Sequence, residues 1–401
     1  MEIKMDIISE LNGKRILIWG YGREGKATEH FLQRCVKPAS VDIFEGKKEE
    51  IVEEDYDFII KSPGIVMNEE NPKYTSETEL FLQQFRDQVI GITGTKGKST
   101  TSAMLYTVLK ACSSRPVLLL GNIGQPCLDY FEEVTEDTII VYEMSCHQLA
   151  HTNVSPHIAI FLNLYEEHLD YYGIVEKYFE AKSHIAAYQK SGDYFFVGEN
   201  VPQIDTKAQR TVLHQPKGVH YELKLAGEHN QYDAQFVERV AELLGCEKEA
   251  VLKSMADFEG LPHRLQYVGT YRGVRYYDDS ISTIPEAAIN AAMSIPDAKT
   301  VLIGGMDRGI NYDLLVAFIR EHKEFQFICA YASGKRIFGE VGDCENCVYA
   351  EDLEQAVEAA VQMTEPGGAC ILSPAAASYG YFKNFEERGE TFQKYVHAFA
   401  Q

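Results

Sequence analysis

The stretch Gly91–Thr101, with the sequence GITGTKGKSTT, has the residue types and spacing of a triphosphate-binding loop. The short apolar run Val89-Ile90 precedes it, as the end of a buried strand would, and residues 102–109 have the apolar periodicity of a helix. A glycine-rich turn between a strand and a helix N-terminus directs backbone N–H groups and the positive end of the helix dipole at one point, which suits phosphate. The stretch therefore predicts a nucleoside triphosphate site.

Two side chains of this loop suggest how the phosphates would be bound. Lys98 would reach the outer phosphates, and the hydroxyl of Ser99 would be a ligand of Mg²⁺. The strict pattern G-x-x-x-x-G-K-[ST] is not met, because Ile92 occupies the position of the first glycine and Gly94 lies inside the loop. Strand, glycines, Gly-Lys-Ser-Thr and helix nevertheless coincide, which favours a phosphate loop over a surface loop that happens to carry a lysine.

Two further candidates follow predicted strands of the same region. Glu143 comes directly after the apolar run 138–142, and His168 lies a few residues after the run 157–163. Because the carboxyl ends of parallel strands share one edge of a sheet, both are expected beside the phosphate loop. A carboxylate there could complete a Mg²⁺ shell, whereas histidine is an unusual Mg²⁺ ligand, and a structural role for His168 is the alternative. Lys182, on a predicted helix, is by itself typical of a solvated lysine.

A second glycine-rich turn lies near the start of the chain. Residues 20–25, GYGREG, follow the apolar run Arg15–Trp19 and precede a predicted helix at 26–33. The next predicted strand, 40–45, ends in Glu45 about twenty residues after the last glycine, which is the spacing of a dinucleotide-binding unit. A third strand, 57–61, leads into the turn 62–65 at its carboxyl end, where ligands of parallel sheets bind. The region predicts a small domain for a nucleotide-like ligand, and a nicotinamide cofactor is one candidate for that ligand.

The alternation of strands and helices predicts an α/β protein of three domains. We expect a Rossmann-like domain at residues 1–88, a central P-loop ATPase domain with a parallel sheet at 89–260, and a C-terminal Rossmann-like α/β domain at 261–401. The segment Gly260–Arg264, GLPHR, interrupts the pattern and is the predicted linker. Arg264 could reach a γ-phosphate or pair with an acid. In the last domain Arg308, Ser378 and Lys383 could hold a small anionic substrate.

Composition excludes several classes of function. The net charge of −22 over 401 residues argues against nucleic acid as a partner, because phosphate backbones require clustered Lys and Arg. No apolar run approaches 18 residues and the start has no signal-peptide pattern, so no membrane association is expected. The nine cysteines suit reduced thiols in a cytoplasm. Cys344-Glu345-Asn346-Cys347 is an isolated C-x-x-C without the second pair or histidines that a metal site would need.

Taken together, the motifs resemble those of the Mur ligases, ATP-dependent amide-forming enzymes of bacterial cell-wall synthesis. The motifs follow the family order over nearly the whole chain, at residues 94–101, 121–124, 143–149, 163–170, 229–230, 260–264 and 279–280. Residues 62–65 and the motif SPAAASYGYFKNFEERG at 373–389 resemble the branch that adds glutamate to UDP-N-acetylmuramoyl-L-alanine. The resemblance implies phosphoryl transfer from ATP to the substrate carboxylate, an acyl phosphate, and attack by the amine of glutamate. We expect a cytoplasmic monomer acting in peptidoglycan precursor synthesis.

The resemblance also implies which residues act. The implied catalytic residues are Lys98, His168, Lys182 and Arg264. The implied ATP-binding residues are Gly94, Thr95, Lys96, Gly97, Lys98, Ser99, Thr100, Asn230, Arg264 and Asp279. The implied UDP-substrate residues are Gly22, Arg23, Glu24, Glu45, Ser62, Pro63, Gly64 and Asn122, the last toward the muramoyl part. The implied glutamate residues are Thr283, Arg308, Ser378, Tyr379 and Phe385. The implied ligands of two Mg²⁺ ions are Ser99, Glu143, His168 and Lys182, the lysine as a carbamate formed with CO₂.

The chain departs from the family pattern at positions that bear on specificity. Residues 279–283 read DSIST where DSKAT is usual, so a lysine is missing, and Arg308 stands near a position where lysine is common. Asp233 replaces an expected asparagine. The first two changes touch the implied glutamate pocket and leave D-glutamate and L-glutamate both open, with D-glutamate favoured. Three competing functions remain beside the glutamate ligase: a nicotinamide dehydrogenase, a folate polyglutamate synthetase and a non-catalytic P-loop regulatory protein.

Overall fold

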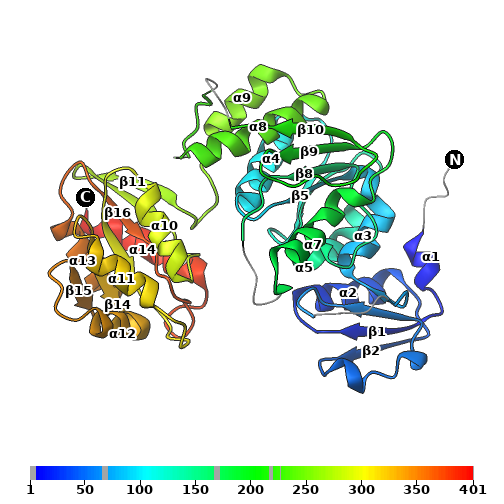
Figure 1. Ribbon diagram of the computed structural model, residues 1–401, viewed down its shortest axis with the longest axis horizontal. Helices are drawn as coiled ribbons and strands as arrows, with labels where there is room; N and C mark the ends of the chain where they lie inside the picture. The colour runs from blue at the N-terminus through cyan, green and yellow to red at the C-terminus, as the bar shows by residue number, and fades with distance from the viewer. Residues whose placement is uncertain (1–5, 66–70, 167–171, 216–219, 226, 401) are drawn as a thin grey trace. The chain divides into compact units, whose positions relative to one another are not determined.

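The computed structural model describes residues 6–65, 71–166, 172–215, 220–225 and 227–400. The chain forms two compact units (Figure 1), the first made of residues 1–223 and 228–257 and the second of residues 224–227 and 258–401. Each unit is an α/β structure, and the described residues of the two units form three sheets. The predicted α/β fold class is therefore confirmed. The predicted domains 1–88 and 89–260 each hold one sheet of the first unit.

The first sheet is built by the N-terminal part of the chain. Its strand order is β2-β1-β3-β4 and all neighbours are parallel. The strands are β1 (Arg15–Trp19), β2 (Ser40–Phe44), β3 (Phe58–Lys61) and β4 (Tyr74–Thr75). The helices are α1 (Ile7–Leu11), α2 (Arg23–Cys35) and α3 (Glu77–Phe85), with short 3₁₀ turns η1 (Lys48–Glu50), η2 (Glu53–Asp55) and η3 (Arg86–Gln88). The predicted GYGREG turn joins β1 to α2, as a nucleotide-binding unit requires.

The second sheet carries the phosphate loop. Its order is β10-β9-β8-β5-β7-β6, and every neighbouring pair is parallel. The strands are β5 (Val89–Thr93), β6 (Val117–Gly121), β7 (Ile139–Glu143), β8 (Ile158–Phe161), β9 (Tyr194–Gly198) and β10 (Gln209–Leu213). The helices are α4 (Lys98–Cys112), α5 (Cys146–Leu149), α7 (Val175–Ala187), α8 (Glu228–Leu243) and α9 (Lys248–Asp257), with the 3₁₀ helix η4 (Cys127–Glu133).

The first two sheets share one apolar core, which explains why they form a single unit. Ile18 and Phe31 of the first sheet region lie in the same buried cluster as Phe81 of α3 and Ile140 and Phe161 of the second sheet. Aromatic pairs such as Phe31 with Phe131 of η4 add contact area between the two regions. Burial of apolar surface is the main stabilising contribution to such an arrangement. The carboxyl edges of both sheets are thereby fixed relative to each other.

The second unit contains a mixed six-stranded sheet of order β11-β12-β16-β13-β14-β15. Only the β11–β12 pair is antiparallel. The strands are β11 (Gln266–Tyr271), β12 (Val274–Asp278), β13 (Ala298–Ile303), β14 (Gln326–Ala330), β15 (Cys347–Ala350) and β16 (Ala369–Leu372). The helices are α10 (Pro285–Ser294), α11 (Asp313–Glu321), α12 (Tyr331–Val341), α13 (Leu353–Met363) and α14 (Phe385–Phe399). The hairpin turn Arg272-Gly273 has φ of +50° and +79°, a twist that suits a two-residue connection.

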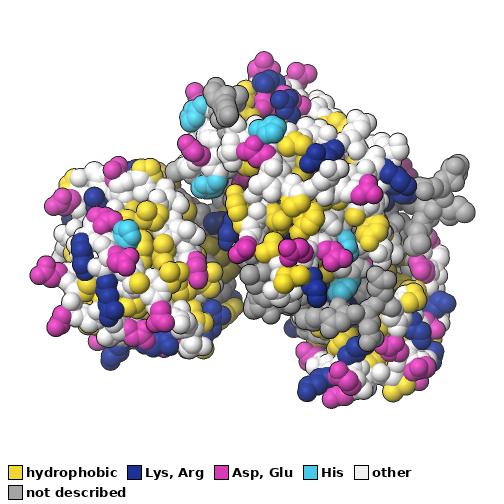
Figure 2. Space-filling model, in the orientation of Figure 1, with side chains coloured by type: hydrophobic (Ala, Val, Ile, Leu, Met, Phe, Trp, Pro, Cys, Tyr) yellow, Lys and Arg dark blue, Asp and Glu magenta, His cyan; other side chains and the backbone are white. Residues whose placement is uncertain are grey.

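On the face drawn in Figure 2, acidic and basic side chains of the described residues are interspersed rather than gathered by sign. None of the helices in the described part of the chain has the length and apolarity needed to cross a bilayer.

Candidate active site

The phosphate loop connects β5 to α4, as predicted. Gly97 caps the helix with φ of +84°, a conformation that glycine adopts without strain. Asn163, after β8, braces the loop from outside: its Oδ1 accepts the N–H of Lys96 at 2.9 Å, and its Nδ2 donates to the carbonyl of Lys96 at 3.0 Å. Lys98 Nζ donates to the carbonyls of Gly94 and Thr95, both at 3.0 Å, so the lysine lies folded over the loop.

Asp233 of α8 lies directly against this loop. A Cβ placed on Gly97 would be 2.4 Å from Asp233 Oδ2, so a larger residue there would have to displace this carboxyl group. Asp233 is 2% exposed, and burial raises the pKa of its carboxyl to about 7. Because position 233 holds aspartate where the family pattern has asparagine, a carboxyl group lies at the phosphate loop.

Glu143 ends β7 beside the loop and has the environment of a metal ligand. It is fully buried and lies opposite Ile92 of β5 in the register of the two strands. Its Oε1 accepts the Nδ2 of Asn122 at 2.7 Å, while its buried Oε2 has no hydrogen-bond partner among the described residues. A buried carboxylate oxygen left unsatisfied is costly, and Mg²⁺ prefers such oxygen ligands.

The remaining predicted metal ligands differ in what the structure shows of them. Ser99 lies in the first turn of α4 at the same sheet edge. His168 lies outside the described residues. Among the described residues, no three His, Cys, Asp or Glu side chains gather as ligands of one metal ion. The protein's own side chains present here fit a Mg²⁺ ion that would also be bound by phosphate oxygens and water, which is how Mg²⁺ is usually held.

Lys182 of α7 is buried, and the interpretation of a solvated lysine is wrong. Its side chain is on a residue only 1% exposed. Its Nζ donates to the carbonyl of Gly94 at 2.8 Å and to Thr93 Oγ1 at 3.3 Å, and it lies 4.9 Å from the ring centre of Tyr178. The helix delivers the amine to the base of the phosphate loop because its apolar face packs on the sheet.

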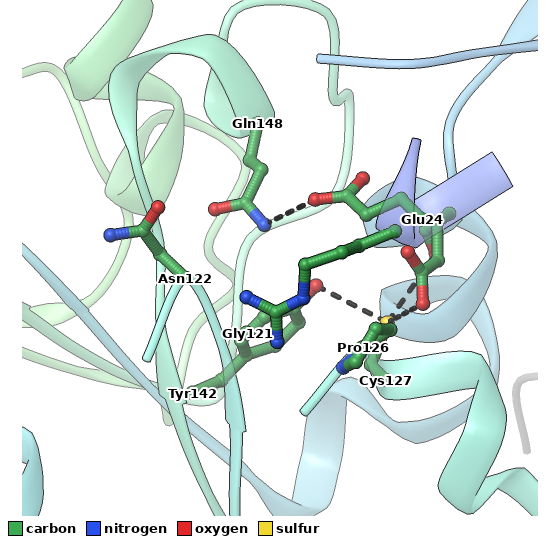
Figure 3. Close-up of a pocket in the computed structure, with 9 residues that line it drawn as sticks. Glu24, Gly121, Asn122, Pro126, Cys127, Tyr142 and Gln148 are labelled. Carbon is green, nitrogen blue, oxygen red and sulfur yellow. Dashed lines mark hydrogen bonds between the residues drawn. The ribbon is translucent and has the colours of Figure 1, made fainter. Parts of the chain in front are cut away.

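A polar cavity of about 100 Å³ lies between the first and second sheets, within the first unit (Figure 3). Three predicted UDP-substrate residues, Arg23, Glu24 and Asn122, line it. Gln148 of α5 donates to Glu24 Oε1 at 2.8 Å, and Arg23 donates to the carbonyl of Gly124 at 2.8 Å, so the GYGREG turn is tied to the second sheet. The other residues that line the cavity are Glu77, Gly121, Pro126, Cys127 and Tyr142.

Two buried carboxyl groups in this cavity were not predicted as a pair. Burial raises the pKa of Glu24 and, more strongly, that of Glu77, which is 2% exposed. Glu77 Oε1 accepts the N–H of Leu128 at 2.8 Å. Lys61 of β3 is nearby, and burial lowers the pKa of its ammonium to about 8. Neither Glu77 nor Lys61 belongs to a pattern that reveals its burial in the sequence.

The turn 62–65 lies beside the GYGREG turn, as the shared sheet edge predicts. Ser62 Oγ donates to the carbonyl of Gly20 at 2.9 Å. A Cβ added to Gly20 would lie 2.6 Å from Ser62 Oγ. Glu45 is exposed directly after β2, and Gly22, Pro63 and Gly64 complete this edge with partly or fully exposed surfaces. The predicted UDP-substrate residues are therefore brought together at the carboxyl edge of the first sheet and in the adjoining cavity.

The second unit gathers the residues predicted for glutamate and part of the ATP set. Asp279 follows β12, accepts the hydroxyl of Ser373 at 2.7 Å and the N–H of Leu265 at 3.2 Å, and has its pKa raised to about 7 by burial. Arg264 is exposed between two residues with positive φ. Of the glutamate set, Ser378 is buried, Tyr379 and Arg308 are exposed, and Thr283 and Phe385 are intermediate.

Arg388, which sequence reasoning missed, joins these loops. It is 1% exposed and donates to Ser280 Oγ at 3.0 Å, to the carbonyl of Ser280 at 2.7 Å and to the carbonyl of Ala376 at 3.0 Å. Ser280 Oγ in turn donates to the carbonyl of Phe385 at 2.8 Å. The loop after β12 and the motif at 373–389 are thus one hydrogen-bonded assembly. The sequence signal that could have revealed this role is the arginine itself, because a buried guanidinium group needs several hydrogen-bond acceptors around it.

The ATP-binding prediction is divided between the two units. Gly94–Thr100 and Asn230, which is buried in the first turn of α8, belong to the first unit. Arg264 and Asp279 belong to the second. The chain thus joins a P-loop α/β unit to a second α/β unit, which carries polar loops at the carboxyl edge of its sheet. This combination defines a nucleotide-dependent enzyme of more than one domain.

Comparisons with known proteins identify the family. The profile described as Mur ligase middle domain matches residues 92–242. The chain is 32% identical over 427 residues to a UDP-N-acetylmuramoylalanine–D-glutamate ligase of Geobacillus kaustophilus, covering 98% of this chain and 94% of that protein. It is 33% identical over 383 residues to the ligase of the same name from Enterococcus hirae, covering 86% and 83%. The chain belongs to the Mur ligase family.

Solved structures show the same fold at lower identity. The MurF ligase of Thermotoga maritima, solved in complex with ADP, is similar with a TM-score of 0.60 and 17% identity, covering 97% of this chain and 96% of that one. The UDP-N-acetylmuramate-alanine ligase MurC of Thermotoga maritima is similar with a TM-score of 0.58 and 18% identity, covering 96% and 99%. The family model and the curated relatives confirm the predicted resemblance to the Mur ligases, and the solved structures confirm the fold.

Proposed function

We propose that this protein is an ATP-dependent ligase that adds D-glutamate to UDP-N-acetylmuramoyl-L-alanine in peptidoglycan precursor synthesis. The observation that carries the proposal is the carboxyl edge of the second sheet, where the phosphate loop, the buried amine of Lys182 and the unpartnered oxygen of Glu143 come together. The substrates come from the relatives, since those covering nearly the whole chain are named UDP-N-acetylmuramoylalanine–D-glutamate ligases.

The first step is phosphoryl transfer from ATP to the substrate carboxylate. The N–H groups of the loop bind the phosphates, and Lys98 exchanges its carbonyl partners for phosphate oxygens as charge develops on them. The carboxylate oxygen forms a bond to the γ-phosphorus while the bond to ADP breaks, which gives an acyl phosphate. Mg²⁺, held by Ser99, Glu143 and His168, would neutralise phosphate charge.

The second step is attack by the amine of glutamate on the acyl carbon, with loss of phosphate. Thr283, Arg308, Ser378, Tyr379 and Phe385 are the residues proposed to bind that glutamate, with Arg308 as the cation for a carboxylate. Asn230, Arg264 and Asp279 are proposed to bind ATP. The UDP-sugar would be held by the edge of the first sheet, at Gly22, Arg23, Glu24, Glu45 and Ser62–Gly64, with Asn122 toward the muramoyl part.

Lys182 is proposed to carry a carbamate. The neutral form of the lysine amine attacks CO₂ and loses a proton. A side chain that is otherwise a cation thereby becomes an anionic oxygen ligand beside the phosphates. The hydrogen bond from its amine to the carbonyl of Gly94 supports this role, because Gly94 belongs to the loop proposed to bind the phosphates. Protein equilibrated with ¹³C-bicarbonate should show a carbamate resonance by NMR that is missing from Lys182→Ala. A spectrum without that resonance in the wild type would exclude the modification.

We also propose a second Mg²⁺ site, a monomeric state and a cytoplasmic location. The second metal site rests on the resemblance to the Mur ligases, and the location on the substrate class. All nine cysteines are free thiols, which suits a reducing compartment.

The deciding experiment measures phosphate release from ATP and Mg²⁺ with UDP-N-acetylmuramoyl-L-alanine and either D-glutamate or L-glutamate. We expect release with D-glutamate only, and its loss in Lys98→Met with nucleotide binding retained in part. Release with L-glutamate only would keep the ligase and make Ile281 and Arg308 the specificity determinants. Release that ignores both amino acids and the UDP-sugar would indicate a regulatory nucleotide hydrolase instead.

A further inference from the structure

A cluster of thiols lies on the last two strands of the sheet in the second unit, β14 and β15, and two of them are at or just before the first residue of β15. Cys344 lies in the turn before β15, Cys347 is the first residue of β15, and Cys329 lies in the neighbouring strand β14. Lys323 lies in the connection from α11 to β14. Cys344 and Cys347 form the C-x-x-C pair for which the sequence indicated no role.

Cys344 is in contact with one cationic side chain and one carboxamide oxygen. Lys323 Nζ lies 2.7 Å from Cys344 Sγ, and Cys344 is half-buried rather than buried. The thiolate is the nucleophilic form of cysteine, and an adjacent ammonium group stabilises it. Asn346 fixes the arrangement: its Oδ1 accepts from Lys323 Nζ and from the Cys344 thiol, both at 3.1 Å. Its Nδ2 donates to three backbone carbonyls and the residue is 3% exposed, so the turn is rigid.

Backbone geometry decides which thiol can react with Cys344. The N–H of Cys347 donates to the carbonyl of Cys344 at 3.1 Å, so the four residues form a turn whose end Cα atoms lie within about 7 Å. A disulfide needs Cα atoms about 4.4–6.8 Å apart. Cys347 is therefore within reach of Cys344.

Cys329 is excluded as a disulfide partner of Cys347, although their sulfur atoms lie 3.5 Å apart. The strand register pairs Cys347 with Phe327, two residues before Cys329. A strand separation of about 4.8 Å and a rise of about 3.3 Å per residue then put the two Cα atoms about 8 Å apart, beyond disulfide range. Instead the two sulfur atoms share a hydrogen bond in which either can be the donor. This hydrogen bond and the charge of Lys323 lower the pKa of Cys347, against the opposing effect of burial. Cys347 is thus disposed to act as a thiolate.

We propose that Cys344 and Cys347 form a peroxide-reactive thiol pair, with Cys344 as the attacking thiol and Cys347 as the resolving one. The Cys344 thiolate attacks one oxygen of a hydroperoxide, the O–O bond breaks, and the leaving oxygen takes a proton to become water or an alcohol. The sulfur is oxidised by two electrons to a sulfenic acid and the peroxide is reduced. Cys347 then attacks this sulfur, the S–O bond breaks, water leaves, and the disulfide forms without further oxidation.

The experiment uses the full chain, reduced and then freed of reductant, treated with hydrogen peroxide and blocked with iodoacetamide. Proteolytic cleavage after Glu345 places the two cysteines in separate peptides, which stay linked only if the disulfide has formed. We expect the Cys344–Cys347 linked pair. In Cys347→Ser we expect a sulfenic acid at Cys344 that reacts with dimedone, and in Lys323→Gln several-fold slower oxidation that Lys323→Arg restores. Lys323 is exposed, so the two Lys323 variants are expected to fold.

A matched internal control exists in the first unit. Cys112 and Cys246 are also half-buried and adjacent, but burial raises the pKa of both. They should oxidise more slowly than Cys344 in the same digest. The proposal fails if Cys344 reacts no faster than Cys112, if Cys344 reacts at the same rate in Lys323→Gln, or if the linked peptides contain Cys329 in place of Cys344.

Discussion

His263 Nδ1 and Asp278 Oδ2 lie 2.7 Å apart in the second unit, and both side chains are buried. The amide of Gln393 donates to the same carboxylate oxygen at 2.8 Å, and the N–H of Ser280 donates to the other at 2.9 Å. The pair is adjacent in sequence to Arg264 and Asp279, both proposed to bind ATP. His263 and Leu265 have φ of +59° and +43°, a costly conformation for residues with a side chain. The pair therefore holds a strained segment that presents Arg264.

Replacing Gly389 of α14 by alanine should disrupt this pair. An added Cβ would lie 2.1 Å from His263 Nδ1 and 2.5 Å from Asp278 Oδ2. We expect Gly389→Ala to lower the free energy of unfolding by about 3 kcal/mol, as overpacking of a tight interior does. Urea denaturation followed by circular dichroism measures this. The matched control is Gly339→Ala in α12, where a Cβ meets nothing within 4 Å and a gain of about 0.5–1 kcal/mol is expected. Equal effects would contradict the clash.

The His263–Asp278 pair should also make stability depend on pH. The hydrogen bond to Asp278 raises the pKa of His263 above its usual 6.5, against the opposing effect of burial, and the carboxylates of Glu390 and Glu386 add to the rise. A raised pKa means that the folded state binds the proton more tightly. The stabilisation is therefore complete below the unfolded pKa and is lost as pH rises through the folded one.

His263→Asn tests this dependence. The loss of unfolding free energy caused by the substitution should be largest at about pH 5.5 and smaller at about pH 8.5. The measurement is a series of urea denaturation curves of wild type and variant across that range. A difference that is constant with pH would mean that the imidazole acts only through packing.

The sequence predicts strands where an apolar run is bounded by turn residues. β1 was predicted with its observed bounds, and the predicted strands 40–45 and 57–61 each exceed β2 and β3 by one residue. The hairpin of β11 and β12 was not predicted, because its strands mix polar and aromatic residues and are placed by the pairing of β11 with β12 and of β12 with the distant strand β16. Helix α8 begins at Glu228 rather than 232, so His229 and Asn230 lie in its first turn.

Burial of charged residues was not predictable in the same way. Lys182 lies on an amphipathic helix whose periodicity does not distinguish an exposed lysine from one that contacts a carbonyl 88 positions away in the chain. Glu77 likewise reads as a first-turn helix acid, yet its partner Leu128 is 51 residues distant. The phosphate loop, by contrast, is a local structure made by consecutive residues, so its sequence is sufficient to predict it.

Asp233→Asn should stabilise the protein at alkaline pH. Burial raises the folded pKa of this carboxyl from 3.8 to about 7, so folding favours its protonated form. Relative to the unfolded chain, stability is lost as pH rises through about 7. Asparagine removes the free-energy cost of holding an ionised carboxylate in this buried position, which is at most ~4 kcal/mol for a pKa shift of this size.

The test compares unfolding free energies at about pH 5 and about pH 8. The advantage of Asp233→Asn over wild type should be greater at the higher pH. Asp137→Asn, an exposed position, controls for the removal of one negative charge from an acidic protein. A variant that is no more stable than wild type at the higher pH would show that ionised Asp233 is compensated by the phosphate loop.

Asn122→Ala should weaken metal binding without contact between Asn122 and the metal. Its Nδ2 donates to Glu143 Oε1 at 2.7 Å and its backbone N–H donates to the carbonyl of Glu143 at 3.0 Å, so it orients the carboxylate whose other oxygen is unpartnered. Loss of a residue that orients a metal ligand typically reduces metal affinity about 10–100-fold. Titration of ADP binding with Mg²⁺, in the absence of UDP-sugar, should show this reduction separately from any effect on the sugar.

Gln148→Ala is the matched control, because Gln148 binds Glu24 in the same cavity and leaves Glu143 in place. It should raise the KM for the UDP-sugar and leave the Mg²⁺ titration unchanged, whereas identical Mg²⁺ curves for Asn122→Ala and wild type would remove Glu143 from the metal site.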